Sequence, residues 1–292
     1  MNAGAFYDAK VLVMGGDIIG KAVLLVARGQ DGVWRTRRGG RDFMATDAEV
    51  ERLCLDVRKS GFYPYLANTE QAEDFRASDK VREEVFERLV RESLASWLAF
   101  AEHRLKGTGR RLVVTSGNDD PFFIDDVLKA SSVVEMAEGD VVELDDGHQM
   151  INLGWTNPTP WHTHRECTEE ELGVKIDEQV VRLAEPQRAI FNLHAPPHNS
   201  GLDSAPKLDE TLRPVEGGAT KVPVGSTAVR AAIERYRPLL GLHGHVHEGR
   251  GSTEIGRTLC LNPGSVYNQG LLAGCLVTLN KGAVKGYQLM EG

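Results

Sequence analysis

The stretch Gly241-Leu242-His243-Gly244-His245-Val246-His247-Glu248 holds three of the nine histidines within five positions, and it decides how the rest of the chain is interpreted. The apolar run at residues 239–242 predicts a short buried strand that Gly244 interrupts. His245 and His247 are two residues apart, so in an extended segment their side chains point the same way and could hold one metal ion or two adjacent ions. Neutral imidazole is the commonest metal-ligating side chain. The alternative is a solvated, histidine-rich loop.

The composition limits the class of protein. Of the 292 residues 41% are hydrophobic, and no repeat divides residues 1–292, which we interpret as a single domain. The net charge of -8 disfavours a general nucleic-acid surface, because phosphate binding needs clustered Lys and Arg. Four widely spaced cysteines favour reduced thiols. No apolar run could span a bilayer and no secretory signal is visible, so we expect a cytoplasmic protein with no membrane partner.

Apolar runs alternate with amphipathic segments along the chain. Buried strands are expected at residues 10–14, 21–27, 111–115, 188–193 and 239–242. Helices are expected at residues 46–60, 79–106, 168–184 and 226–236. This alternation is typical of an α/β fold.

Polar residues follow four of these strands. The residues at these strand ends are Asp17, Asn118, His194, His245 and His247. Open α/β sheets bind ligands at the carboxyl ends of their strands. Oxygen and imidazole ligands that converge there are suited to a divalent transition metal ion. The sequence therefore predicts a metal site at this edge.

The order of these motifs resembles that of the calcineurin-like metallophosphoesterase superfamily. The matching stretches are Gly16-Asp17, Gly117-Asn118-Asp119-Asp120, His194, Gly244-His245-Val246-His247 and Asn262-Pro263-Gly264-Ser265. The stretches at residues 15–21, 157–161 and 165–166 are similar to a prokaryotic-type subgroup. The resemblance runs from about residue 2 to the C-terminus. It implies an α/β fold with two packed mixed β-sheets flanked by helices, and a two-metal site at the strand ends.

The resemblance also implies a role for each matched residue. Asp17 would bridge two divalent ions; Asn118, His194 and His245 would complete the ligands of one ion, and His247 would bind the other. Mn, Fe, Zn and Ni all suit these mixed ligands. Two ions of this kind hold a bridging hydroxide in line with phosphorus. The implied function is hydrolysis of a small phosphomonoester or phosphodiester substrate.

Two departures from the family pattern stand out. Many members have His after the motif Asn, whereas this chain has Asp119, which we interpret as a catalytic acid or as a residue that orients Asn118. The family also opens with a strand that ends in D-x-H, and here residues 2–8 already resemble the helix after it. The D-x-H at Asp146 to His148 comes too late in the chain and is interpreted as a surface feature. We therefore expect the first strand to be missing and the second ion site to be incomplete.

Three further residues are candidates for substrate binding. Lys21 follows the bridging Asp and could pair with a phosphate, although a solvated lysine is an equal alternative. His164 and Arg165 lie in a loop stiffened by prolines and could line the cleft. The arginines at positions 35, 37, 38 and 41 form a basic patch, interpreted as a solvated hairpin. The alternative function is a binding or scaffold protein that keeps the fold and has lost catalysis with the first motif.

Overall fold

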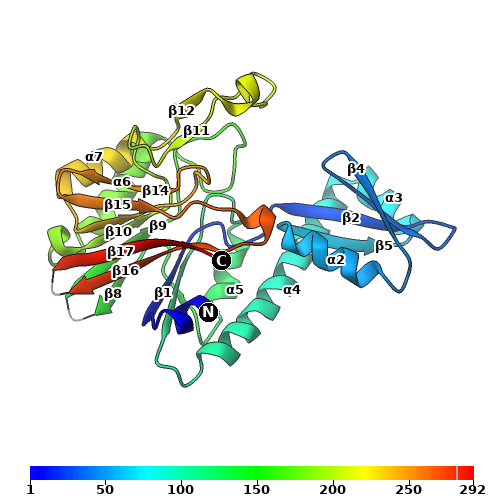
Figure 1. The fold of residues 1–292 in the computed structure, drawn as a ribbon, viewed down its shortest axis with the longest axis horizontal. Helices are drawn as coiled ribbons and strands as arrows, with labels where there is room; N and C mark the ends of the chain where they lie inside the picture. The colour runs from blue at the N-terminus through cyan, green and yellow to red at the C-terminus, as the bar shows by residue number, and fades with distance from the viewer. Residues whose placement is uncertain (146, 281) are drawn as a thin grey trace. The chain divides into compact units, whose positions relative to one another are not determined.

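The computed structural model describes residues 1–145, 147–280 and 282–292, drawn as a ribbon in Figure 1. The chain divides into two compact units. The first unit comprises Met1–Ile18, Phe100–Ser265 and Leu272–Gly292, and the second comprises Ile19–Ala99 and Val266–Leu271. The interpretation of residues 1–292 as one domain stays a prediction. No helix among the described residues is both long and apolar enough to cross a membrane.

A six-stranded sheet forms the centre of the first unit, in the order β14-β15-β13-β10-β9-β8. Its strands are β8 (Val141–Asp145), β9 (His148–Leu153), β10 (Ile190–Leu193), β13 (Leu240–Leu242), β14 (Gly251–Ile255) and β15 (Thr258–Asn262). The four central strands are parallel, and β8 and β14 run antiparallel at the two edges. The carboxyl ends of β10 and β13 therefore lie at the same edge of the sheet.

A second layer packs on one face of this sheet. It contains the parallel strands β1 (Val11–Gly15), β6 (Arg111–Thr115) and β7 (Glu135–Met136), and the hairpin β16 (Ala273–Asn280) with β17 (Ala283–Glu291). Val113 of this layer lies in one core cluster with Ile190 and Leu240 of the six-stranded sheet. Among the described strands β1 pairs with β6 alone and is an edge strand.

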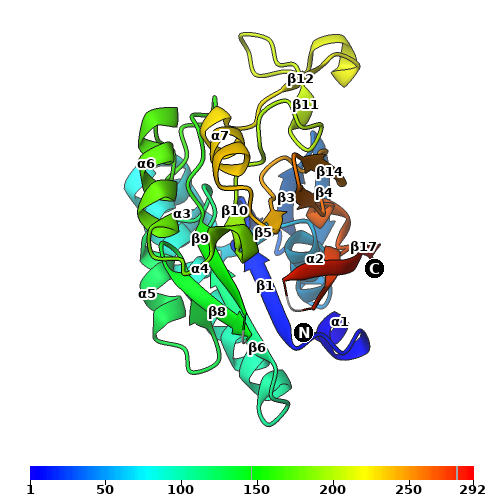
Figure 2. The same cartoon turned by 90° about the vertical axis from the view of Figure 1, so that its left-hand side faces the viewer.

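Helices cover the opposite face of the six-stranded sheet (Figure 2). These are α6 (Glu169–Val180) and α7 (Thr227–Tyr236), and Phe191 packs with their residues Ile176 and Ile233. Ile190 and Phe191 belong to different core clusters, because successive strand residues face opposite sides. The predicted α/β fold, two packed β-sheets flanked by helices, is confirmed.

The remaining elements of the first unit are short. They are α1 (Asn2–Phe6), α5 (Phe123–Lys129), η1 (Pro186–Arg188), β11 (Ser204–Pro206), η2 (Val215–Gly218) and β12 (Lys221–Pro223). The predicted helix at 168–184 ends at Val180, and Thr168 caps it in a capping box with Glu171. The long helix α4 (Asp79–Leu105) contributes residues to both units.

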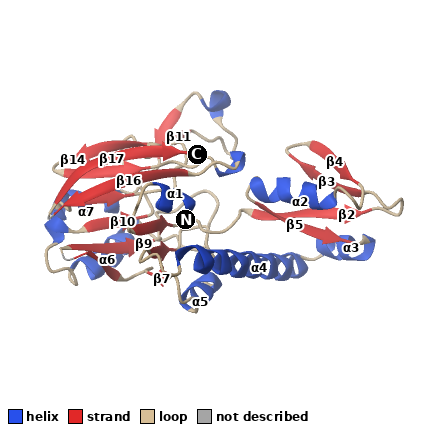
Figure 3. Ribbon diagram, turned by 60° about the horizontal axis from the view of Figure 1, so that its bottom comes forward, coloured by secondary structure: helices blue, strands red, loops and turns tan. Residues whose placement is uncertain are grey.

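The second unit is built on a four-stranded mixed sheet in the order β4-β3-β2-β5. Its elements are β2 (Ala22–Arg28), β3 (Trp34–Arg38), β4 (Arg41–Ala45), α2 (Val50–Lys59), β5 (Phe62–Ala67), α3 (Thr69–Ala77) and η3 (Tyr267–Gln269). Figure 3 shows α2 and α3 on opposite faces of this sheet. The helix predicted from Thr46 begins at Val50, because Thr46 and Glu49 form a turn in front of it.

Candidate functional site

The ends of four strands in the first unit bring the predicted ligands together. Asp17 follows β1, Asn118 follows β6, His194 follows β10 and His245 follows β13. β1 pairs in parallel with β6, and β10 pairs in parallel with β13, so each pair ends on the same side. Asp17 and His245 have left-handed backbones, with φ of 52° and 61°. Strained residues of this kind cluster at functional sites.

Two glycines let the turns approach each other. A Cβ at Gly16 would lie 2.4 Å from Nδ1 of His194. A Cβ at Gly117 would lie 2.3 Å from the backbone nitrogen of Asp17. A side chain at either position would push the Asp17 turn away from its neighbours, so glycine is required for the close approach.

His194 is held in the orientation that a metal ligand needs. Its side chain is 3% exposed, and Nδ1 lies 2.8 Å from the carbonyl oxygen of Gly15. Because a carbonyl can only accept, Nδ1 carries a proton, and whenever the ring is neutral the lone pair lies on Nε2. Nε2 is buried and makes no hydrogen bond within the described residues, although it lies 3.4 Å from Oδ1 of Asp17. That separation suits an ion pair, but its geometry does not form a hydrogen bond.

The charges around His194 favour its protonated form, so a metal ion at Nε2 would have to displace a proton. Burial lowers the pKa of His194, but the charge of Asp17 and the Gly15 carbonyl raise it, and the net direction is upward. Asp119 donates its backbone N–H to Oδ1 of Asp17 at 3.2 Å. The Asp17 carboxylate is therefore the negative centre of the cluster.

Asn118 faces His245 and is oriented by a threonine. Nδ2 of Asn118 donates to Oγ1 of Thr163 at 2.8 Å, which turns Oδ1 toward Nδ1 of His245 at 2.9 Å. The hydroxyl of Thr163 in turn donates to Glu166 at 2.6 Å. The rings of His194 and His245 meet edge to face with centroids 5.5 Å apart. Sequence reasoning missed Thr163, which has no motif of its own.

Asp120 fastens the two loops that carry Asp17 and Asn118. It is fully buried, and its carboxylate accepts from the backbone of Ile18 at 2.9 Å and of Gly117 at 2.7 Å. Sequence reasoning gave Asp120 no role, although its place in the G-N-x-[DE] pattern was a signal.

The cluster contains donor atoms of the kinds that divalent transition ions bind, but they lie in two separate pairs. Asp17 and His194 form one pair and Asn118 and His245 form another, which gives carboxylate, amide and imidazole donors. Among the described residues, no three His, Cys, Asp or Glu side chains are grouped so that they could hold one ion. A bound ion would replace the direct contact between Asn118 and His245. His247 is half-buried two residues beyond His245, and its role as a ligand stays a prediction.

His243, the third histidine of the motif, belongs to the core. It is 6% exposed, and Nδ1 lies 2.9 Å from the carbonyl oxygen of Leu193 and 3.1 Å from that of Ala195. Burial lowers the pKa of His243 to about 4. A neutral histidine that bonds to the backbone holds the end of β10 against the end of β13, close to His194.

Arg165 is a buried connector. The side chain is 2% exposed, Nη2 donates to Asp125 at 2.8 Å, Nε donates to the carbonyl oxygen of Asp120 at 3.2 Å, and the guanidinium lies 4.5 Å from the centroid of the Phe122 ring. The predicted role of Arg165 in substrate binding stays a prediction. Arg165 ties the 157–167 loop to the turn after β6.

The other predicted site residues have different surroundings. His164 is exposed; partial burial and the charge of Arg165 lower its pKa, while the charge of Asp119 acts in the opposite direction. His164 and Asp119 therefore influence each other, and their roles in substrate binding and catalysis stay predictions. Lys21 belongs to the second unit, where its N–H donates to the carbonyl of Gly61 at 2.9 Å, and its role also stays a prediction.

The interpretation of the late D-x-H as a surface feature was wrong for its histidine; Asp146 lies outside the described residues. His148 is 1% exposed, Nδ1 lies 2.7 Å from Asp145, and Nε2 accepts from the N–H of Gly282 at 3.2 Å. Because both ring nitrogens have partners, the imidazole can be buried. It joins the turn between β8 and β9 to the hairpin of β16 and β17.

Comparisons with known proteins found a curated relative. The chain is 34% identical over 116 residues to Uncharacterized protein MJ1162 of Methanocaldococcus jannaschii. The match covers 39% of this chain and 46% of that protein, so the chain spans about half the length of the curated relative it matches. No family model matches the chain.

Two solved structures from Thermus thermophilus were also found. The protein TT1561 is 12% identical with a TM-score of 0.37, and the match covers 87% of this chain and 93% of that chain. Sulfate thiohydrolase SoxB, in complex with glycerol, is 13% identical with a TM-score of 0.35, and the match covers 84% of this chain and 41% of that chain. Likenesses this weak carry no conclusion about activity.

Proposed function

We propose that the protein is a metal-dependent phosphoesterase that hydrolyses a small phosphomonoester or phosphodiester. The observation that carries the proposal is His194, whose buried Nε2 lacks a hydrogen bond in the part of the chain that the structure describes and lies 3.4 Å from Asp17. A buried polar atom without a partner costs about 1–3 kcal/mol. Such an atom calls for an explanation, and an ion bound between His194 and Asp17 supplies one.

Four residues would hold the first ion: Asp17, Asn118, His194 and His245. Asp17 and His247 would contribute to a second. A bound divalent ion supplies positive charge that neutralises phosphate oxygens and acidifies water. Mn, Fe, Zn and Ni all suit this mixture of donors.

Other residues of the chain would position the metal ligands and supply a proton to the leaving group. Asp120 holds the loops that carry Asp17 and Asn118, and Thr163 fixes the amide of Asn118. Asp119 is half-buried and His164 is exposed, so both are open to the solvent from which a substrate arrives. Either group could give a proton to the oxygen of the leaving group.

A matched pair of histidine variants tests the proposal. Wild type, His245→Ala and His198→Ala are loaded with Mn, and metal content and hydrolysis of p-nitrophenyl phosphate and bis-p-nitrophenyl phosphate are measured. His245→Ala should lose bound metal and at least about 100-fold of the activity, because a direct ligand is removed. His198 lies 3.8 Å from Asp203 and outside the cluster, so His198→Ala should keep both. Equal metal content in wild type and His245→Ala would rule out the assignment.

A scaffold or binding protein of the same fold is the second candidate. The direct contact of 2.9 Å between His245 and Asn118 favours it, because this pair is satisfied without an ion. If a metal-loaded preparation hydrolyses neither ester, the phosphoesterase proposal is rejected and the scaffold or binding function takes its place.

A further inference from the structure

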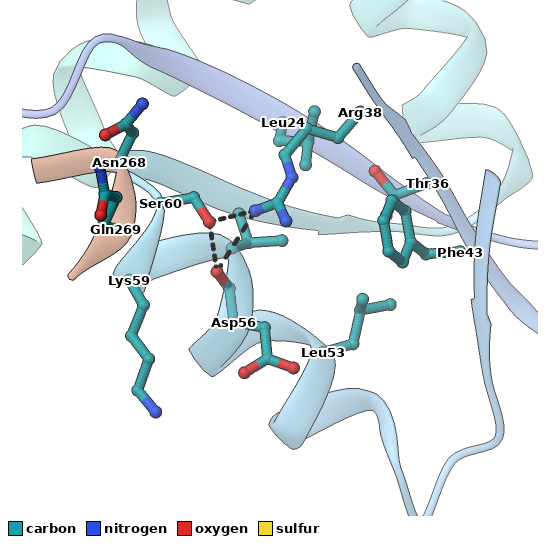
Figure 4. A pocket seen from close by; sticks show the side chains of 11 residues that line it. Leu24, Thr36, Arg38, Phe43, Leu53, Asp56, Lys59, Ser60, Asn268 and Gln269 are labelled. Carbon is teal, nitrogen blue, oxygen red and sulfur yellow. Dashed lines mark hydrogen bonds between the residues drawn. The ribbon is translucent and has the colours of Figure 1, made fainter. Parts of the chain in front are cut away.

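The second unit contains a pocket of about 290 Å³ that the candidate metal site does not use. All of its lining residues belong to that unit, and they come from β2, β3, β4, α2 and η3 (Figure 4). Its apolar wall is formed by Leu24, Phe43, Leu53 and Val57. The polar residues of its lining include Thr36, Arg38 and Ser60.

Strand alternation directs Arg38 into the pocket. Thr36 pairs with Phe43 across β3 and β4, and all three residues line the same cavity. Arg35 and Arg37 alternate with them and are exposed, bonded to Asp31 and Asp42. The prediction that these arginines are solvated is therefore correct for Arg35 and Arg37. It is wrong for Arg38, which is half-buried.

One side of the Arg38 guanidinium is fixed and the other has hydrogen-bonding capacity. Nη1 donates to the hydroxyl of Ser60 and to the carbonyl oxygen of Asp56. The guanidinium lies 5.5 Å from the centroid of the Phe43 ring. Nε and Nη2 donate no hydrogen bond within the described residues. These two nitrogens form the fork that binds a carboxylate or a phosphate with two parallel hydrogen bonds.

Thr36 provides a second, independent observation. The residue is 6% exposed, and its buried Oγ1 has no hydrogen-bond partner among the residues that the structure describes. In Figure 4, Thr36 and Phe43 lie on one side of the pocket, and Ser60 and Asn268 lie on the other. A ligand atom in the pocket would give this hydroxyl the partner that buried hydroxyls normally have.

The charges favour an anion. Arg38 and Lys59 are the cations of the lining and Asp56 is its one anion, in a chain whose net charge is -8. A cavity near 300 Å³ is at the small end of the range for small-molecule sites, which are mostly apolar with a few placed polar groups.

We propose that this pocket binds a small organic anion. Its carboxylate or phosphate head is held by Nε and Nη2 of Arg38, its apolar body lies against Phe43, Leu53 and Val57, and a polar atom meets the hydroxyl of Thr36. The inference is independent of the phosphoesterase proposal, because no residue is shared between the two sites.

Benzoate and phenyl phosphate are the probes, with benzyl alcohol as the uncharged control. Each is titrated into the full, metal-free chain labelled with ¹⁵N, and the amide shifts of residues 36–44 and 53–61 are followed. Both anions, or one of them, should move these signals, and benzyl alcohol should move them far less. Which anions bind identifies the head group. Absence of shifts there at about 10 mM of either anion, which corresponds to a binding free energy weaker than about -3 kcal/mol, would overturn the proposal.

Two matched arginine variants test whether Arg38 is the residue that binds the anion. Arg38→Gln should weaken binding of the anion at least about tenfold, whereas Arg37→Gln, which removes the same charge from the outer face of the same strand, should stay within about twofold. Thermal melting shows whether both variants fold. Thr36→Val should weaken binding by about threefold or more. Wild-type affinity in Arg38→Gln would overturn the proposal, and wild-type affinity in Thr36→Val would remove Thr36 from the site.

Discussion

The candidate metal cluster and the pocket of the second unit both contain a buried polar atom that lacks a hydrogen bond in the described residues, but opposite charges lie next to them. Nε2 of His194 faces the carboxylate of Asp17, whereas Thr36 shares its pocket with the guanidinium of Arg38. The neighbouring charge is the reason that we propose a cation for the site in the first unit and an anion for the pocket in the second.

The two sites also differ in what holds their side chains. In the first unit a backbone carbonyl orients His194, and the backbones of Ile18 and Gly117 hold Asp120. In the second unit a hydroxyl and a carbonyl at the end of α2 hold Arg38. Backbone groups make all three of these contacts in the first unit and one of the two in the second, so we expect the metal cluster to tolerate substitution less than the pocket does.

The largest effect is expected from removing the negative charge of the first site. Asp17→Asn should abolish metal binding and lower phosphoesterase activity by at least about 100-fold, since it removes the one negatively charged ligand of the proposed first ion. Elemental analysis and ester hydrolysis check this. Asp42→Asn, an exposed carboxylate of the second unit, is the control and should change neither. Normal metal content in Asp17→Asn would contradict the proposal that the negative charge of Asp17 is needed to bind the ion.

Gly117 tests whether the first site depends on its tight backbone. Gly117→Ala should destabilise the protein by about 2–4 kcal/mol, because the new Cβ would lie 2.3 Å from the nitrogen of Asp17. Chemical unfolding measures this. Gly173→Ala is the matched control: it lies in α6, its new Cβ would have 3.9 Å to its nearest neighbour, and the change should stabilise by about 0.5–1 kcal/mol. Similar stabilities of the two variants would contradict the tight-turn explanation.

Asp120 tests whether the loops of the metal cluster depend on their own hydrogen bonds, separately from the pocket of the second unit. Asp120→Asn keeps the shape but weakens the bonds to the N–H groups of Ile18 and Gly117, so metal affinity should fall about 10–100-fold while binding of anions in the second unit stays constant. Metal titration and the benzoate titration check the two halves. A parallel loss of both would show a general loss of folding.

Glu138 is a buried carboxyl group of the first unit that gives a pH-dependent prediction. Burial raises the pKa of Glu138 to about 8, although Arg165 and the N–H of Gly154 act in the opposite direction. The folded state therefore binds its proton more tightly than the unfolded state, and this contribution to stability is lost as the pH rises from about 4.5 to about 8.

A melting experiment checks this direction. Glu138→Gln should lose less stability than wild type between pH 5 and pH 8, with a gap in melting temperature of about 2–4 °C for each kcal/mol. A control such as Glu254→Gln, in the exposed edge strand β14, should follow wild type. A pH dependence of Glu138→Gln equal to that of wild type would mean that this carboxyl ionises normally.

The sequence predicted most of the strands and helices, because these follow from local pattern. It also placed polar residues at the strand ends, and their role as metal ligands stays a prediction. Runs such as residues 111–115 have the apolar periodicity of a buried strand, and the polar residue after each run must lie at the sheet edge. Thr36 and Arg38 lie on one face of β3, but the sequence analysis treated Arg38 as solvated and did not single out Thr36. What covers that face, helix α2, is a tertiary fact that no local pattern contains.

Two residues are buried by partners that are distant in the sequence, for the same reason. Arg165 was expected at a substrate, but Phe122 and Asp125, both more than 35 positions earlier in the chain, bury it. His148 was expected at the surface, but Gly282 reaches it from the far end of the chain. Charged and polar side chains carry no local sign of a distant partner, so sequence reasoning assigns them to solvent or ligand by default.

The long sequence separations within the metal cluster have a consequence for how the protein folds. The bond from Ile18 to Asp120 closes 102 residues, and the one from His194 to Gly15 closes 179. Closing such loops is slow, and no contiguous fragment holds the ligands in place. In a refolding time course, tight metal uptake should therefore lag behind helix formation and coincide with the last phase. The ion would act as a reporter of the finished chain and would not nucleate its assembly.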